Sequence, residues 1–189
     1  MSSFDGQQEG ERILYTITPH AIHKYLAIAR LLFLALFFFV VLWVIGGIVP
    51  VITIGLRVAG FVLAIILLIV GYWWNLTVFK KSRSYITDRR IVRFDVVSPF
   101  FTTKRALFWN EALKAKAYSP NIFFRSLKIG TIDVEPQQAE HEDVRIRDVY
   151  YFEDLANYID KILFIFKNSP GEIAAIKPFV PKAKGQRDL

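Results

Sequence analysis

Two long apolar runs, separated by a short connector, constrain this chain more than any other feature. Residues 31–49 and 58–79 form runs of 19 and 22 residues without a charged side chain. At about 1.5 Å per residue, each run is long enough as a helix to cross a hydrocarbon core of roughly 30 Å. The alternative is a buried hairpin in a soluble protein, but soluble core helices are seldom apolar on every side, and little other chain remains to bury two. The sequence therefore predicts a membrane α hairpin of two transmembrane helices, with its turn in residues 50–57.

Basic residues indicate the orientation of this hairpin. Lys24 and Arg30 precede the first run, Arg57 alone lies between the runs, and six Lys and Arg residues follow the second run by residue 93. Positive residues are retained on the cytoplasmic side of a membrane, so we expect both termini in the cytoplasm. Trp73 and Trp74 then mark the cytoplasmic end of the second span, where amphipathic rings prefer to lie.

The rest of the 189-residue chain leaves room for one small domain of roughly a hundred residues. We expect an N-terminal cytoplasmic arm over residues 1–24, the two-helix hairpin over residues 25–79, and the domain over residues 80–168. A disordered basic tail over residues 169–189 completes the chain, because that stretch has too little apolar content to fold by itself. No cleavage site follows the first span, so we expect that span to stay in the mature protein.

Charge is distributed unevenly along the chain. Residues 80–132 contain 12 Lys and Arg against 3 Asp and Glu, whereas residues 133–165 contain 3 against 9. The basic stretch begins at the membrane and no nucleic-acid-binding motif accompanies it, so we expect no nucleic acid partner. The chain has no cysteine, which excludes disulfides, thiolate metal sites and cysteine nucleophiles.

The hydrophobic period changes from 3.6 to 2 after the second span, which predicts an antiparallel sheet. Six strands are expected, over residues 82–87, 90–97, 103–109, 112–118, 127–135 and 144–149. Gly130 is expected to form a β-bulge. Residues 11–18 also alternate, as a short strand or an extended arm would, and residues 1–10 are expected to be disordered. Apolar residues recur at spacings of three and four from Phe152 to Phe166, which predicts an amphipathic C-terminal helix.

Three motifs, in this order, resemble those of a known family. Ser84-Tyr-Ile-Thr-Asp-Arg-Arg-Ile-Val92 is similar to a Tyr-x-Leu-Thr-Asp-x-Arg segment, Arg125-Ser-Leu-Lys-Ile-Gly-Thr-Ile132 to a Gly-Thr-Ile strand, and Ile146-Arg-Asp-Val149 to a final strand before a helix. With two spans before the domain, residues 11–166 resemble the YdbS-like bacterial membrane-anchored pleckstrin-homology (PH) domain family, domain of unknown function 304. The resemblance implies an α+β, PH-like antiparallel β-barrel or sandwich capped by a C-terminal helix, in the bacterial inner (plasma) membrane.

Signatures of catalysis are missing from the sequence. It contains no Gly-x-Ser-x-Gly elbow, no His-Glu-x-x-His, no phosphate-binding Gly-rich loop and no dinucleotide fingerprint. His141, Glu142 and Asp143 are adjacent residues of metal-ligating type, but neighbours in a polar turn rarely converge on one ion, which favours a solvated loop. The family resemblance likewise implies binding or adaptor domains. We therefore expect no enzymatic activity, no catalytic residue, no cofactor and no metal ion.

Two sets of residues are candidates for binding. The basic set comprises Lys80, Lys81, Arg83, Arg89, Arg90, Arg93, Lys104 and Arg105. It could bind anionic lipid headgroups or a protein partner, or it could serve only to fix the topology of the chain in the membrane. The aromatic set comprises Phe100, Phe101, Phe123 and Phe124. These residues lie in two loops with basic neighbours, so they could contact a membrane or a partner, or they could cap the barrel.

The function expected from these observations is that of a non-catalytic binding or adaptor module at the cytoplasmic face of the inner membrane. Its partners would be a protein, further copies of the chain, or an anionic lipid surface. The alternative is a small accessory subunit of a membrane transport or envelope-stress complex, which would act through its transmembrane hairpin.

Overall fold

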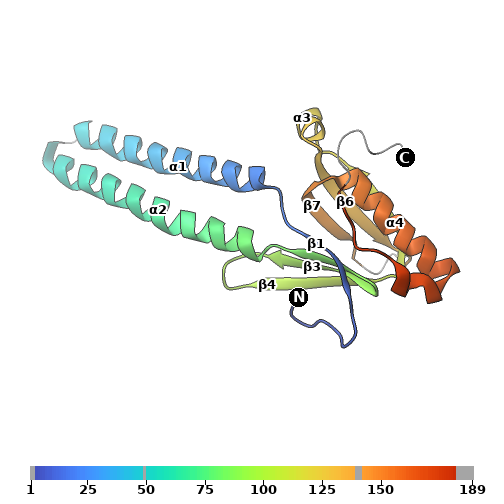
Figure 1. The fold of residues 1–189 in the computed structure, drawn as a ribbon. Coiled ribbons are helices and arrows are strands. Elements are labelled where there is room, and N and C mark those ends of the chain that lie inside the picture. The colour runs from blue at the N-terminus through green and yellow to red at the C-terminus, as the bar shows by residue number, and fades with distance from the viewer. Residues whose placement is uncertain (1–2, 49, 139–141, 182–189) are drawn as a thin grey trace. The chain divides into compact units, whose positions relative to one another are not determined.

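A computed structural model describes residues 3–48, 50–138 and 142–181 (Figure 1). The described chain forms two compact units. The hairpin unit comprises Ala21–Lys81 and a separate loop, Val96–Phe101. The sheet unit comprises the described residues up to His20, Ser82–Asp95, and those from Thr102 onward.

Two antiparallel helices, α1 (Ala21–Ile48) and α2 (Thr53–Lys81), make up most of the hairpin unit, with the short helix η1 (Pro50–Ile52) between them. Both are long and apolar enough to span a membrane, and only 11% and 6% of their most apolar stretches are buried. A core helix of a soluble protein would be mostly buried. The two predicted candidate spans are therefore present, and their connector is shorter than expected because α2 already begins at Thr53.

Small residues allow α1 and α2 to approach closely. Ala35, Gly46 and Gly60 are the buried residues of the two helices. A Cβ atom added at Gly60 would lie 3.0 Å from the Cβ of Leu42, so a larger residue there would push α1 away. Arg57, the charged residue of the predicted connector, lies in α2 with its guanidinium carbon 4.7 Å from the centre of the Trp43 ring.

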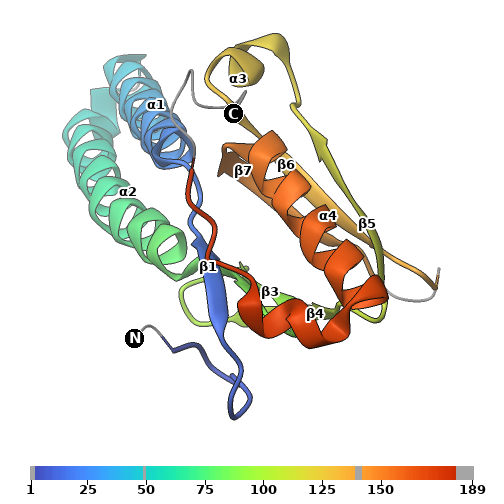
Figure 2. The same cartoon turned by 45° about the vertical axis from the view of Figure 1, so that its right-hand side comes forward.

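The sheet unit contains two antiparallel sheets (Figure 2). In the first, the strand order is β1 (Ile13–Ile17), β2 (Ser84–Thr87), β3 (Arg90–Val96) and β4 (Thr102–Phe108). In the second, the order is β5 (Ala112–Tyr118), β6 (Ile129–Pro136) and β7 (Val144–Tyr150). The strands predicted after the hairpin match β2 to β7 within a few residues. Over the described residues the two sheets do not join into a closed barrel.

The hairpin is an insertion between two paired strands. β1 precedes the hairpin and β2 follows it, yet the two strands pair antiparallel, with Ile17 opposite Ser84. The chain thus leaves the sheet at Ile17 and re-enters it at that residue's own partner. The predicted N-terminal arm is therefore, in part, an edge strand of the first sheet.

Helix α4 (Phe152–Asn168) covers the second sheet and completes the core, as the periodicity predicted. Its buried positions include Leu155, Ile159 and Ile162. Strand β6 passes beneath the start of this helix, where a Cβ at Gly130 would lie 2.5 Å from the ring of Phe152. The register of β6 against β7 shifts between Gly130 and Ile132, which confirms the bulge predicted there.

The N-terminal segment before β1 packs on the sheet rather than being disordered as expected. Phe4 is buried, and its ring stacks on that of Tyr85 at 4.7 Å between centroids. Phe94 completes the cluster with an edge-on contact to Phe4 at 6.3 Å. Aromatic burial offsets the entropic cost of ordering this polar segment, whose composition by itself predicted disorder.

The segment after α4 also differs from the disordered tail that was expected. The short helix η2 (Pro170–Ala175) turns the chain back, and Ile176 is buried in the main core. The Phe179 ring lies 4.9 Å from that of Tyr15, and its backbone N donates to the carbonyl oxygen of Leu14. The described part of the tail, up to residue 181, is thus folded against α4 and β1.

Candidate functional site

The loop Val96–Phe101, here the aromatic loop, joins β3 to β4 and belongs to the hairpin unit. The Phe100 ring lies 6.1 Å from that of Trp73 and 6.3 Å from that of Trp74, between centroids. Nζ of Lys81 donates a 2.6 Å hydrogen bond to the carbonyl oxygen of Pro99. These contacts hold the loop at the C-terminal end of α2. All three rings remain partly exposed, which is typical of an aromatic cluster at a membrane–water interface.

The aromatic loop satisfies its own backbone. Val97 N donates to the carbonyl oxygen of Phe101 at 3.1 Å, and the Ser98 hydroxyl oxygen accepts from Phe101 N at 3.1 Å. The side chains of Val97, Phe100 and Phe101 are each more than 70% exposed. Phe100 and Phe101 therefore do not cap a core, which was one of the two interpretations left open by the sequence.

The second aromatic pair lies on α3 (Ile122–Ser126), a one-turn helix between β5 and β6 that periodicity could not reveal. Phe123 is 61% exposed and Phe124 is half-buried, and their rings are T-shaped with their centroids 5.9 Å apart. Asn121 caps the helix, since its Oδ1 accepts from Phe124 N at 2.8 Å. The available sequence signal was Asn121, a residue type favoured at helix N-caps. This pair is also outside the buried core.

The eight basic candidates differ in what their charges contact. Lys80 and Lys81 belong to the hairpin unit and the other six to the sheet unit. Two are exposed with no ion-pair partner among the described residues, namely Lys80 and Arg83. Three are exposed but donate to uncharged oxygens, namely Lys81, Arg89 and Lys104. Three are paired with carboxylates, namely Arg90, Arg93 and Arg105.

Two of the paired residues form a surface network. Arg93 pairs with Asp95, and Arg105 lies 3.4 Å from the same carboxylate through Nε and 2.7 Å from Glu142 through Nη1. Burial lowers the pKa of Arg93, and Asp95 offsets this only in part. Because acidic neighbours already balance these charges, Arg93 and Arg105 contribute little to attraction of an anionic ligand.

Arg90 is buried, contrary to its place in the exposed basic set. Its Nε and Nη2 each donate to Glu11 at 2.9 Å, one to each carboxylate oxygen. Glu11 also accepts from the Thr87 hydroxyl at 2.9 Å and from Gln8 N at 2.8 Å. Burial alone would raise the pKa of Glu11, but the bonds from Arg90, Gln8 and Thr87 outweigh it and lower the pKa. Arg90 therefore joins the N-terminal segment to the β2–β3 hairpin and is unavailable to a headgroup.

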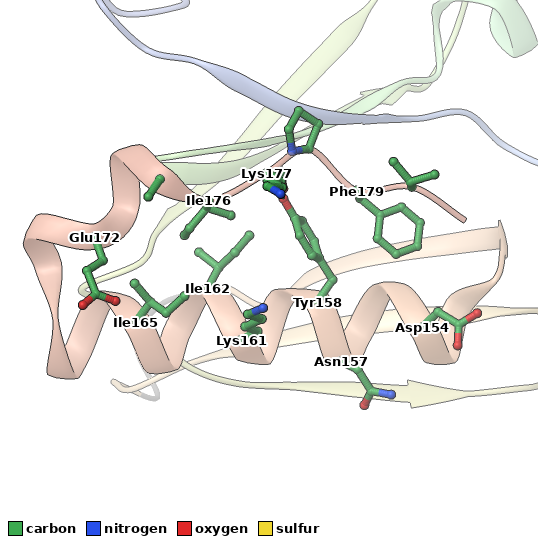
Figure 3. A pocket seen from close by; sticks show the side chains of 13 residues that line it. Asp154, Asn157, Tyr158, Lys161, Ile162, Ile165, Glu172, Ile176, Lys177 and Phe179 are labelled. Carbon is green, nitrogen blue, oxygen red and sulfur yellow. The ribbon is translucent and has the colours of Figure 1, made fainter. Parts of the chain in front are cut away.

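A cavity of about 880 Å³ lies between α4 and the folded C-terminal segment (Figure 3). Ile162, Ile176 and Phe179 line it with apolar surface, whereas Lys161 and Glu172 are charged lining residues. The Tyr158 hydroxyl donates to the carbonyl oxygen of Lys177 at 2.7 Å, and burial raises the pKa of Tyr158 to about 12. Sequence reasoning missed this cavity because it assigned no structure to the segment that forms one wall.

The described residues do not indicate a metal centre. No group of three or more His, Asp and Glu side chains among them is arranged to hold a metal ion. His141, the first residue of the acidic turn considered above, lies outside the described residues.

Comparisons with protein-family models, with curated proteins and with solved structures found no match to this chain. The likeness to the PH domain family therefore stays a prediction that depends on three motifs and on the order of the elements.

Proposed function

We propose that this chain is a membrane-anchored, non-catalytic binding module. Its hairpin crosses the bacterial inner membrane, both termini are cytoplasmic, and the sheet unit is a PH-like domain that binds a ligand at the cytoplasmic face. The observation that carries this proposal is the aromatic loop, whose Phe100 packs on Trp73 and Trp74 at the end of the second candidate span.

Chain connectivity supports a function at the membrane surface. The chain passes between the hairpin unit and the sheet unit four times, at residues 20/21, 81/82, 95/96 and 101/102. At each crossing, directly consecutive residues join the two units. A domain tethered in this way meets any ligand on the bilayer surface at a high effective concentration, so weak contacts are enough for binding.

The ligand is a protein or an anionic lipid surface. Among the basic candidates of the sheet unit, the exposed ones with no carboxylate partner in the described part of the chain are Arg83, Arg89 and Lys104. Near an anionic leaflet each such charge contributes about 1 kcal/mol. The same cations could meet acidic patches on a protein, mainly by raising the rate of association.

The second candidate function places binding in the hairpin, as in an accessory subunit of a transport or envelope-stress complex. The observation that favours it is an apolar groove of about 460 Å³ on the hairpin unit, into which a transmembrane helix of a partner could pack. Its lining residues are Leu32, Ala35, Leu36, Phe39, Phe61, Ala64, Ile65 and Leu68.

Two variants of the full chain separate these functions. Arg83→Glu combined with Arg89→Glu reverses charge on the sheet unit, and Ala64→Phe fills the hairpin groove. Each is purified from membranes in mild detergent, and the co-purifying proteins are compared with those of the wild type. If the co-purifying proteins are lost from the double variant but not from Ala64→Phe, the sheet unit is the part that binds them. Loss with Ala64→Phe alone would contradict the proposal and favour the hairpin; unchanged thermal unfolding confirms that each variant is folded.

A further inference from the structure

We propose that residues 118–128, here the α3 tip, form a second membrane contact, in which apolar side chains enter the bilayer interface and basic side chains meet lipid headgroups. This inference rests on the proposed function and specifies its ligand as the lipid surface. It adds a site, on the β5–β6 connection, to the aromatic loop already described.

Apolar exposure is concentrated at the α3 tip. Ile122 is 88% exposed and Phe123 is 61% exposed, and Tyr118 and Leu127 are also exposed. Single exposed apolar residues are ordinary on protein surfaces, but four within ten residues form a patch that water solvates poorly. Large apolar and aromatic side chains of this kind partition into the region between headgroups and acyl chains.

Side chains of the α3 tip form hydrogen bonds with its backbone, which lowers the cost of moving this backbone out of water. Asn121 accepts from Phe124 N, and the Ser126 hydroxyl donates to the carbonyl oxygen of Phe123 at 2.8 Å. The Ser119 hydroxyl lies within hydrogen-bond distance of the carbonyl oxygens of Asn121 and of Ile129, the first residue of β6. Backbone groups that lack partners are costly away from water. Because the polar side chains of the tip bond to its own backbone, the groups left to meet a ligand are apolar or cationic.

The cations of the α3 tip, Arg125 and Lys128, complement anionic headgroups. Residues 118–128 contain no Asp or Glu. However, Glu153 and Asp154 at the start of α4 line a small cavity together with Arg125 and Lys128 and reduce the local positive charge. The apolar side chains should therefore provide most of the contact, and anionic lipid should strengthen it rather than be required for it.

A bilayer is a better occupant than a protein pocket for this patch. The hairpin already ties the sheet unit to a membrane, so the encounter with lipid is intramolecular and needs no partner. A convex one-turn helix with an apolar end and basic neighbours matches the layered chemistry of a membrane interface.

The absence of cysteine from the chain allows a direct test. Phe123→Cys is spin-labelled in the full chain, which is reconstituted into vesicles of phosphatidylcholine with or without phosphatidylglycerol. Collision of the label with oxygen, which is enriched in lipid, is compared with collision with a water-soluble nickel complex. Phe164→Cys is the matched control, since Phe164 is a similarly exposed phenylalanine on α4. Phe101→Cys reports on the aromatic loop.

The expected result is that the label at residue 123 collides more often with oxygen than with nickel in both vesicles, more strongly with phosphatidylglycerol, whereas the label at residue 164 does the opposite. Arg125→Glu should remove the effect of phosphatidylglycerol. If the label at residue 123 stays in water while the label at residue 101 is in lipid, the membrane contact of the α3 tip is overturned and the proposed function is not. If both labels stay in water, the proposed function is contradicted as well. Protection from both reagents at residue 123 overturns the inference in favour of a protein contact. Ile122→Cys replaces Phe123→Cys if that variant fails to fold.

Discussion

Arg89 and Arg90 are neighbours in the chain, yet only Arg90 has a buried carboxylate within reach. The Glu11 side chain is fully buried, and Arg90 holds it with two hydrogen bonds. Arg89 is exposed and donates to the side-chain oxygen of Gln8 at 3.1 Å. Thr87 fixes the backbone turn that contains both arginines, because its hydroxyl oxygen accepts from the backbone N of each of them. The two residues should therefore respond very differently to the same substitution.

Arg90→Gln is expected to destabilise the sheet unit by about 3 kcal/mol, because it leaves the buried carboxylate of Glu11 without its cation. Arg89→Gln is the matched control and should change stability by less than about 0.5 kcal/mol. Thermal unfolding of the detergent-solubilised chain, followed by the fluorescence of buried Trp109, measures both. Equal shifts in the two variants would contradict the buried ion pair.

The same ion pair predicts a dependence of stability on pH. In the folded chain the pKa of Glu11 lies below its ordinary value of 4.5. Its contribution is therefore complete above that value and is lost as the pH falls through the lowered pKa. The stability difference between wild type and Glu11→Gln should be constant from neutral pH to about pH 5 and shrink at lower pH. A difference that grows on acidification would contradict this assignment.

The sequence could not separate these two arginines. Both follow the Thr-Asp turn, and the residue that decides between them, Glu11, lies 79 positions from Arg90. Nothing in the local pattern indicates a contact across the inserted hairpin. By contrast, the turn at Ser98 and Pro99 could be predicted from local chemistry, although the sequence left open whether Phe100 and Phe101 cap a core.

At the scale of elements, the packing of α1 on α2 depends on Gly60. Gly60→Leu should force the helices apart and cost about 1–3 kcal/mol, because the added side chain would overlap Leu42. Gly55→Leu is the control, since no atom lies within 4 Å of a Cβ added there. The loss of helical circular dichroism with temperature measures both variants. Comparable midpoints for the two variants would show that α1 does not pack at this position.

The C-terminal segment is held by Ile176 and Phe179. Ile176→Ala should destabilise the sheet unit by about 2–4 kcal/mol, since it opens a cavity between α4 and the rest of the core. Val180→Ala, at a residue 75% exposed, should have little effect. Denaturant unfolding and limited proteolysis after residue 169 report on both. Identical behaviour of the two variants would contradict a folded C-terminal segment and favour the disordered tail that the composition predicted.

Apolar patterns and turn residues in the sequence predicted most of the elements. Burial repeats along α4 and alternates along β7, whereas all four residues of β2 and the first six of β6 are buried. The bounds of these strands were still predicted within a few residues, because turn residues separate them in the sequence. The exceptions have no such pattern. Helix α3 is a single turn, and the segments before β1 and after α4 are polar chains fixed by a few apolar contacts, such as those of Phe4 and Ile176. The sequence also could not decide whether the two sheets close into a barrel, because closure depends on pairings between distant strands. Over the described residues they do not close.

At the scale of the whole molecule, the topology of the chain gives the hairpin a defined role. The hairpin leaves the sheet at Ile17 and returns at Ser84, and these residues are strand partners. An insertion with two spans returns the chain to the side of the membrane from which it left, so β1 and β2 can pair only if both ends of the hairpin face the same compartment. The pairing thus supports, from the fold, the common location of the termini that the basic flanks predicted.

The central claim, a hairpin that crosses the membrane between two paired strands, is tested most directly by accessibility of single cysteines. Ser3→Cys, Val51→Cys and Gly171→Cys are introduced separately into the cysteine-free chain and produced in bacterial cells. Spheroplasts are then treated with a membrane-impermeant maleimide before and after permeabilisation. The claim predicts labelling of residue 51 in intact spheroplasts and of residues 3 and 171 only after permeabilisation. Labelling of all three residues in intact spheroplasts, or of none of them before permeabilisation, would contradict it.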